Sequence, residues 1–97
     1  MSYTVELAPA SVRTFKKLPA DVQERIRPAL AKLAREAARR GRIGGKAVKT
    51  IQGAGDSFHR LRVGDYRIMY DVIQEDGVIL VLGIVHRSDL ERWIRNR

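Results

Sequence analysis

The side chains of this sequence best suited to chemistry are arginines gathered around one predicted turn. Arg60 and Arg62 precede a two-residue turn at Gly64-Asp65, and Arg67 follows it. Such a turn places Arg62 directly opposite Arg67, and paired residues share a face of a sheet, so the three guanidinium groups project together. Like charges in this arrangement destabilise a sheet, so packing alone gives no reason for the three arginines to lie together. Binding of an anion does give one. The alternative is a solvated basic face whose arginine stems cover apolar surface.

A fourth arginine, Arg87, comes at the end of a later predicted strand. A three-residue loop at residues 75–77, with Gly77 at positive φ and a bulge, would put Arg67 and Arg87 on the same face. A two-residue turn would put them on opposite faces. The sequence leaves both registers open.

The two histidines, His59 and His86, have different predicted surroundings. His59 falls on the apolar face of its strand, where we interpret it as a core residue. His86 precedes Arg87 and is a candidate for proton transfer. The pair does not match a metal-binding pattern, and the sequence has no Ser-His-Asp spacing and no phosphate-binding glycine loop.

The elements that must position these residues follow from hydrophobic periodicity. Alternation predicts a strand over 3–7, and helical spacing predicts a helix over 9–18 and a second one that Asp21 caps and Gly41 ends, with a kink at Pro28. Residues 41–56 are rich in glycine and basic, and we expect a mobile loop there. Three strands are predicted over 57–63, 66–74 and 78–87, followed by a short helix over 88–97.

This order predicts an α+β domain, one unit over residues 1–97. We expect an antiparallel β-sheet, made of the N-terminal strand plus a three-stranded meander, that is packed by an N-terminal helical hairpin and a short C-terminal helix.

Composition limits the class of protein. The formal net charge is +8 and the sequence pI is about 10.6, which favours a polyanionic or acidic partner. There is no cysteine, so disulfides and thiolate metal sites are excluded, and a reducing cytoplasm suits the chain. No apolar run approaches the roughly 20 residues that a membrane span needs. We expect no metal and no cofactor.

Two segments together resemble the RelE/ParE superfamily of toxins. The family has a Lys-x-Leu-x-Gly segment, then an aromatic-x-Arg-x-Arg-x-Gly-Asp-Tyr-Arg-x-x-Tyr strand pair, and a later His-Arg. The matching residues here are Lys49-Thr50-Ile51-Gln52-Gly53, Phe58 through Tyr70, and His86-Arg87. The resemblance extends over nearly the whole chain and includes Leu18-Pro19 between the two helices.

The resemblance implies a type II toxin–antitoxin module, in which a cognate antitoxin neutralises the toxin. RelE-type members are metal-independent endoribonucleases that cut mRNA in the ribosomal A site, where the RNA 2′-hydroxyl attacks the adjacent phosphorus. By resemblance the catalytic residues are Arg60, Arg67 and Arg87, since arginines can stabilise the transition-state charge. The residues assigned to RNA contacts are Lys46, Lys49, Phe58, Arg62, His86 and Trp93.

One departure from the family concerns the C-terminal segment, where RelE-type members usually carry a Tyr and this chain has none. The equivalent position is Glu91, which could act as a base, or Trp93, which could stack. Trp93 as a core anchor for the last helix is the alternative. The missing Tyr favours a ParE-type DNA gyrase inhibitor as the second functional hypothesis. A third is a degenerate member that only binds its antitoxin, with the complex acting on operator DNA.

Overall fold

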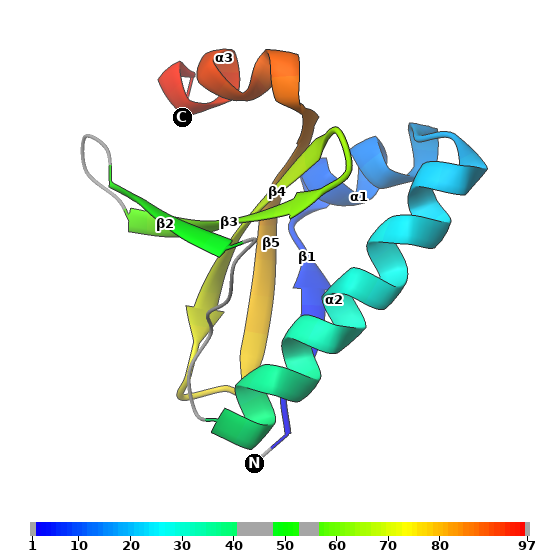
Figure 1. Ribbon diagram of the computed structural model, residues 1–97. Coiled ribbons are helices and arrows are strands. Elements are labelled where there is room, and N and C mark those ends of the chain that lie inside the picture. Colours follow the sequence, from blue (N-terminus) through cyan, green and yellow to red (C-terminus); the bar gives the residue numbers. More distant parts are fainter. Residues whose placement is uncertain (1, 41–47, 53–56, 97) are drawn as a thin grey trace.

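The sheet at the centre of the fold has five strands in the order β1-β5-β4-β3-β2 (Figure 1). The structure is a computed structural model that describes residues 2–40, 48–52 and 57–96. The strands are β1 (Thr4–Leu7), β2 (Val48–Gln52), β3 (Ser57–Val63), β4 (Tyr66–Ile73) and β5 (Val78–His86). The helices are α1 (Pro9–Lys17), α2 (Ala20–Arg40), the 3₁₀ turn η1 (Arg87–Asp89) and α3 (Leu90–Arg95).

The predicted α+β class is confirmed, with two corrections to the sheet. Strand β1 pairs with β5 in parallel, so the sheet is mixed. Residues 48–52, expected to be part of a mobile loop, form strand β2, which pairs antiparallel with β3. The rest of that expected loop, 41–47 and 53–56, lies outside the described residues.

The side chain of Gln23 in α2 contacts the end of α1. The Nε2 amide of Gln23 donates to the carbonyl oxygens of Phe15 (2.8 Å) and Leu18 (3.1 Å), which lie at the carboxyl end of α1. The last carbonyls of a helix have no N–H partner from a following turn, and Gln23 supplies donors to two of them; the Phe15 carbonyl also accepts the Leu18 N–H at 3.2 Å. Helix α2 begins at Ala20, and the Pro19 carbonyl accepts the first helical N–H groups. Asp21 therefore lies inside the first turn rather than at the expected cap. The helix continues without interruption through Pro28.

Two apolar clusters lie on opposite faces of the sheet. The larger joins α2 to alternate strand residues and includes Ile26, Leu30, Leu61, Ile68 and Tyr70. The smaller joins α3 to the residues between them and consists of Phe58, Met69 and Leu90, with Leu82, Val85, Trp93 and Ile94 packed against it. Because side chains alternate along a strand, this division places α2 on one face and α3 on the other.

A β-bulge in β5 changes the register of the β4–β5 pair. Tyr70 pairs with Val81, but the preceding Met69 pairs with Gly83, so Leu82 is an extra residue in β5. The turn between these strands has four residues, 74–77, with Gly77 at φ +63°. Neither of the two turns considered, the three-residue loop with its own bulge or the two-residue turn, is found, whereas the positive φ of Gly77 is confirmed. The bulge lies within the strand instead.

Gly83 has a specific packing role at this bulge. The indole of Trp93 lies directly over it, and a Cβ on Gly83 would come within 2.6 Å of the indole Cζ2. Only glycine lets α3 approach the sheet this closely. Trp93 is half-buried in the smaller cluster and makes an edge-to-face contact with Phe58, with ring centroids 5.4 Å apart.

Candidate functional site

The β3–β4 hairpin places three arginines on the face that carries α3. Arg62 pairs directly with Arg67, and Arg60 pairs with Met69. Met69 belongs to the α3 cluster, whereas Ile68 is fully buried in the α2 cluster. Arg60, Arg62 and Arg67 therefore share one face of the sheet, as the two-residue turn predicts.

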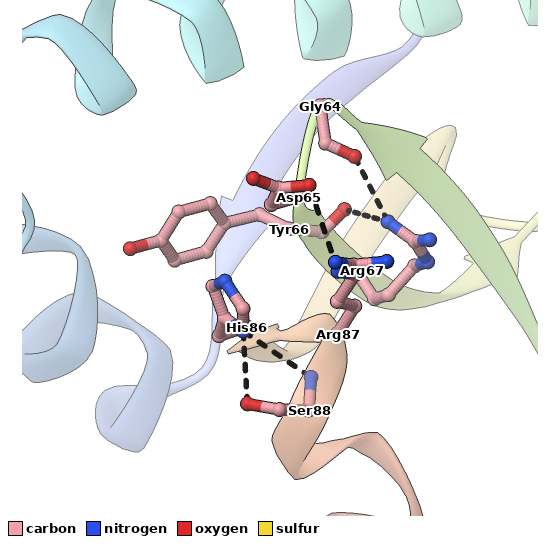
Figure 2. A network of polar contacts seen from close by, with 7 residues as sticks. All are labelled: Gly64, Asp65, Tyr66, Arg67, His86, Arg87 and Ser88. Carbon is pink, nitrogen blue, oxygen red and sulfur yellow. Dashed lines mark hydrogen bonds and ion pairs between the residues drawn. The ribbon is translucent and has the colours of Figure 1, made fainter.

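The bulge decides the position of Arg87. Arg67 pairs with Val85, and Arg87, the first residue of η1, follows two residues later. The positive charge of Arg87 lowers the pKa of Arg67, so the two side chains lie near each other on the same side of the sheet. Without the bulge, the register that β4 and β5 have next to the 74–77 turn would continue, and Arg67 and Arg87 would lie on opposite faces. Arg87 is then attached to the β3–β4 turn: its backbone N–H donates to the Asp65 carbonyl oxygen at 2.7 Å, and its Nε lies 3.6 Å from Asp65 Oδ1 (Figure 2).

Arg67 is held by its own turn. Its Nη1 donates to the carbonyl oxygens of Gly64 and Tyr66, each at 3.0 Å (Figure 2). These bonds fix the side chain beside the turn and leave its other N–H donors for an external anion. The Gly64 backbone has φ +58°, a conformation that glycine adopts without strain.

The charges of the four arginines act on one another. The pKa of the Arg67 guanidinium lies below its ordinary value, first because of burial and then because of the positive charges of Arg60, Arg62 and Arg87. The Asp65 carboxylate acts in the opposite direction. We refer to Arg60, Arg62, Arg67 and Arg87 as the arginine cluster. Mutual repulsion within it means that a bound anion would stabilise it.

The arginine cluster is accessible. Arg62 and Arg87 are exposed, and Arg60 and Arg67 are half-buried. Among the described residues the ion pairs are Arg87–Asp65 and Arg92–Asp89, so no carboxylate neutralises the other three members of the cluster.

His86 lies apart from the cluster. It pairs with Tyr66, and its ring meets the Tyr66 ring edge-to-face with centroids 5.5 Å apart, on the opposite side of the sheet from Arg67 (Figure 2). Its Nδ1 accepts the backbone N–H of Ser88 at 3.2 Å and lies 2.9 Å from the Ser88 hydroxyl. This geometry gives His86 the role of a cap for η1 and does not aim it at the arginines.

The aromatic residues expected at the site pack inside the protein. Phe58 is only 3 % exposed and lies under Trp93 and Met69 in the α3 cluster. Its ring has no free face for a nucleotide base, so the expected base contact is not supported by this geometry. Trp93 acts as the core anchor of α3, the second of the two roles considered for it. Glu91 is exposed in the first turn of α3.

The remaining expected site residues are two lysines, and His59, which was expected in the core, lies on the other face. Lys49 is the register partner of Arg60 on β2, and Lys46 lies outside the described residues. His59 stacks on Tyr70 within the α2 face, with ring centroids 5.2 Å apart, in agreement with its interpretation as a packing residue. The sequence indicates Asp65 only as a turn residue, and its contacts with Arg87 make it part of the site.

Two kinds of feature were not found in the described parts of the chain. No group of three or more His, Asp or Glu side chains among the described residues is placed to hold a metal ion. No helix in the described parts of the chain is long and apolar enough to cross a membrane.

Comparison with solved structures defines the class of the fold, which is that of RelE toxins. The archaeal RelE–RelB complex from Pyrococcus horikoshii OT3 matches with a TM-score of 0.68 and 29% sequence identity over 91% of this chain and 98% of that chain. The RelBE2 toxin–antitoxin complex from Mycobacterium tuberculosis matches with a TM-score of 0.61 and 25% identity over 90% of this chain and 100% of that chain. A mutant of the E. coli toxin RelE shares the fold at 19% identity, with a TM-score of 0.61 over 96% and 92% of the two chains.

The sequence places the chain more narrowly within this class. The family model of the ParE toxin of type II toxin–antitoxin systems, parDE, matches residues 5–91. The chain therefore belongs to the ParE toxin family, within the RelE/ParE superfamily, and the resemblance seen in the sequence is confirmed. No curated protein matches it in sequence.

Proposed function

We propose that this toxin is a metal-independent endoribonuclease that cuts mRNA in the ribosomal A site. The arginine cluster carries the proposal, because its guanidinium groups gather on one exposed surface and repel one another until an anion binds. A phosphodiester supplies that anion, and ribosome and mRNA are then partners in the cytoplasm.

The chemistry requires little beyond charge and positioning. The RNA 2′-hydroxyl gives its proton to a base, its oxygen attacks the adjacent phosphorus, and the bond to the 5′-oxygen breaks. The leaving 5′-oxygen takes a proton from water, so the products are a 2′,3′-cyclic phosphate and a 5′-hydroxyl. Arg67 and Arg87 would donate to the non-bridging oxygens as their charge grows in the transition state. Arg60 would assist them and Arg62 would bind a neighbouring phosphate. With His86 on the other side of the sheet, Glu91 is our candidate for the base.

The test is primer extension on mRNA from translating ribosomes incubated with the purified toxin. The wild-type protein should produce breaks within codons, and Arg67→Ala should lower the cleavage rate by about a hundredfold or more. Arg35→Ala, which removes the same charge from an exposed position on α2, should cleave as the wild type does. Equal cleavage by Arg67→Ala and the wild type would reject this site.

A ParE-type inhibitor of DNA gyrase is the second candidate. It is supported by the match to the ParE toxin family and by the packing of Trp93, which leaves the C-terminal segment without an exposed aromatic for stacking. A supercoiling assay with purified gyrase separates the two functions. Inhibition by the toxin without any ribosomal cleavage would establish the second candidate and exclude the first.

We further propose a cognate antitoxin that neutralises the toxin with an acidic or amphipathic segment over the arginine cluster. The solved relatives from P. horikoshii and M. tuberculosis are a RelE–RelB complex and a RelBE2 toxin–antitoxin complex. Because exposed charges are screened by salt, the association rate of the complex should fall as ionic strength rises. A rate that is independent of salt would contradict the electrostatic part of this proposal.

A further inference from the structure

Among the described residues, Asp65 is the one carboxylate that forms an ion pair with the arginine cluster, and it has two separate connections to Arg87. The backbone bond from Arg87 N–H to the Asp65 carbonyl, at 2.7 Å, is short and independent of either side chain. The ion pair, with 3.6 Å between Nε and Oδ1, is long, and both side chains are about two-thirds exposed. The backbone bond fixes the position of Arg87, whereas an exposed ion pair of this length is weak and is easily exchanged.

We propose that the Asp65 carboxylate is the counter-anion of the arginine cluster while no RNA is bound, and that a phosphate group of the substrate replaces this carboxylate as the partner of Arg87. This inference depends on the proposed function only in that the cluster binds phosphate. In the empty protein the carboxylate offsets part of the repulsion among four cations, an effect also visible in its raising of the Arg67 pKa. In the bound protein it repels the incoming phosphate.

Asp65 thereby sets how strongly the toxin binds RNA in general. A cluster without the carboxylate would be more positive and would hold any single-stranded polyanion more tightly. The carboxylate lowers this nonspecific binding, so that the toxin binds strongly only to a target that makes further contacts with it. Asp65 is therefore a specificity-determining residue and does not itself take part in the chemical step.

The test uses Asp65→Asn, which removes the charge but keeps a side-chain oxygen and the backbone carbonyl. Asparagine is also tolerated in tight turns, so the hairpin should form. The probe is a short fluorescein-labelled 2′-O-methyl oligouridylate, which lacks the attacking hydroxyl and reports binding alone. By fluorescence anisotropy at low salt, Asp65→Asn should bind about fivefold more tightly than the wild type, and the difference should shrink at high salt.

The matched control is Asp89→Asn, which breaks the other exposed Arg–Asp pair of the described residues and should leave the affinity unchanged. A purely structural role for Asp65 predicts weaker binding in Asp65→Asn, and equal or weaker binding overturns the inference. Arg67→Ala separates this failure from that of the proposed function: if it binds as tightly as the wild type, the cluster is not the phosphate site and both proposals are wrong.

A second measurement needs no variant. In the wild-type protein the Asp65 carboxyl carbon and the Arg87 Nε–Hε group should both shift in NMR spectra as the oligouridylate is added, because their ion pair is exchanged. An Asp65 carboxyl signal that stays constant while the Arg87 signal moves would contradict the proposal that phosphate replaces Asp65 as the partner of Arg87.

Discussion

Arg62 of β3 and Arg67 of β4 are direct cross-strand partners beside the Gly64-Asp65 turn. Cross-strand neighbours of like charge destabilise a hairpin. Two further positive charges, those of Arg60 and Arg87, also act on Arg67. The hairpin therefore retains an arrangement that its own folding does not favour. This relationship between stability and binding leads to the first prediction.

Arg62→Glu should stabilise the protein and weaken its RNA binding at the same time. The new carboxylate would face Arg67 across the hairpin, so an attraction would replace the repulsion between Arg62 and Arg67. The free energy of unfolding should rise by about 0.5 kcal/mol. Urea denaturation and oligouridylate anisotropy measure the two effects. Arg35→Glu on α2 makes the same change of charge away from the cluster, and a similar gain in stability there would attribute the effect to net charge instead.

Arg67→Lys should introduce a pH dependence that the wild type lacks. Burial and the three neighbouring cations lower the pKa of the group at this position. Arginine remains charged even so, but a lysine starts from about 10.4 and would lose its proton in the mildly alkaline range. Affinity of the variant for a 2′-O-methyl oligoadenylate, whose bases do not titrate in this range, should therefore fall as pH rises from about 8 to 10, whereas that of the wild type should not. Parallel curves for both proteins would argue against this electrostatic environment.

Tyr70→Phe should leave the fold intact and increase its stability, most of all at high pH. The Tyr70 ring is fully buried, and its hydroxyl has no hydrogen-bond partner among the described residues. Burial raises the pKa of this hydroxyl above its ordinary value of 10.0, so the folded protein keeps the proton that the unfolded chain releases. Wild-type stability should thus fall as pH rises above about 10, with a smaller fall in Tyr70→Phe.

At neutral pH the same variant should gain about 1 kcal/mol, because it no longer buries a polar group without a partner. Thermal denaturation across the pH range gives both results. Loss of stability in Tyr70→Phe at neutral pH would show that the hydroxyl is bonded in solution.

Gly83→Ala should loosen α3 from the sheet. The added methyl group would overlap the Trp93 indole, and overpacking of this kind costs about 1–3 kcal/mol. In a Trp93→Leu background the same substitution should cost much less, because the overlapping ring is gone. A double-mutant cycle from urea denaturation gives the coupling between the two positions, and a coupling near zero would contradict the contact.

The sequence predicted the positions of Arg60, Arg62 and Arg67 because one local feature determines them. A two-residue turn fixes the pairing of its flanking strands, and alternation then fixes the face. The position of Arg87 depends on an irregularity in β5, where Val78 to Val85 are apolar apart from Gly83. Both faces of this strand are packed, so alternation gives no sign of the bulge.

Other parts of the site depend on contacts between distant segments. Strand β2 is short and follows a glycine-rich stretch, and only its pairing with β3 shows it to be a strand. The burial of Phe58 results from Trp93, which in turn needs Gly83 beneath it. Glycine in a strand suggests a bulge or a close approach, and at Gly83 it marks both.

The extra residue in β5 divides the β4–β5 hairpin into two independently adjustable parts. The distal part, near the 74–77 turn, could be lengthened or shortened by one residue on each strand without reversing the side of the sheet to which Arg87 belongs. Deletion of Leu82 alone would reverse it, along with every side chain from Gly83 onward. Transfer of the arginine cluster to a related protein therefore requires that this single inserted residue be transferred as well.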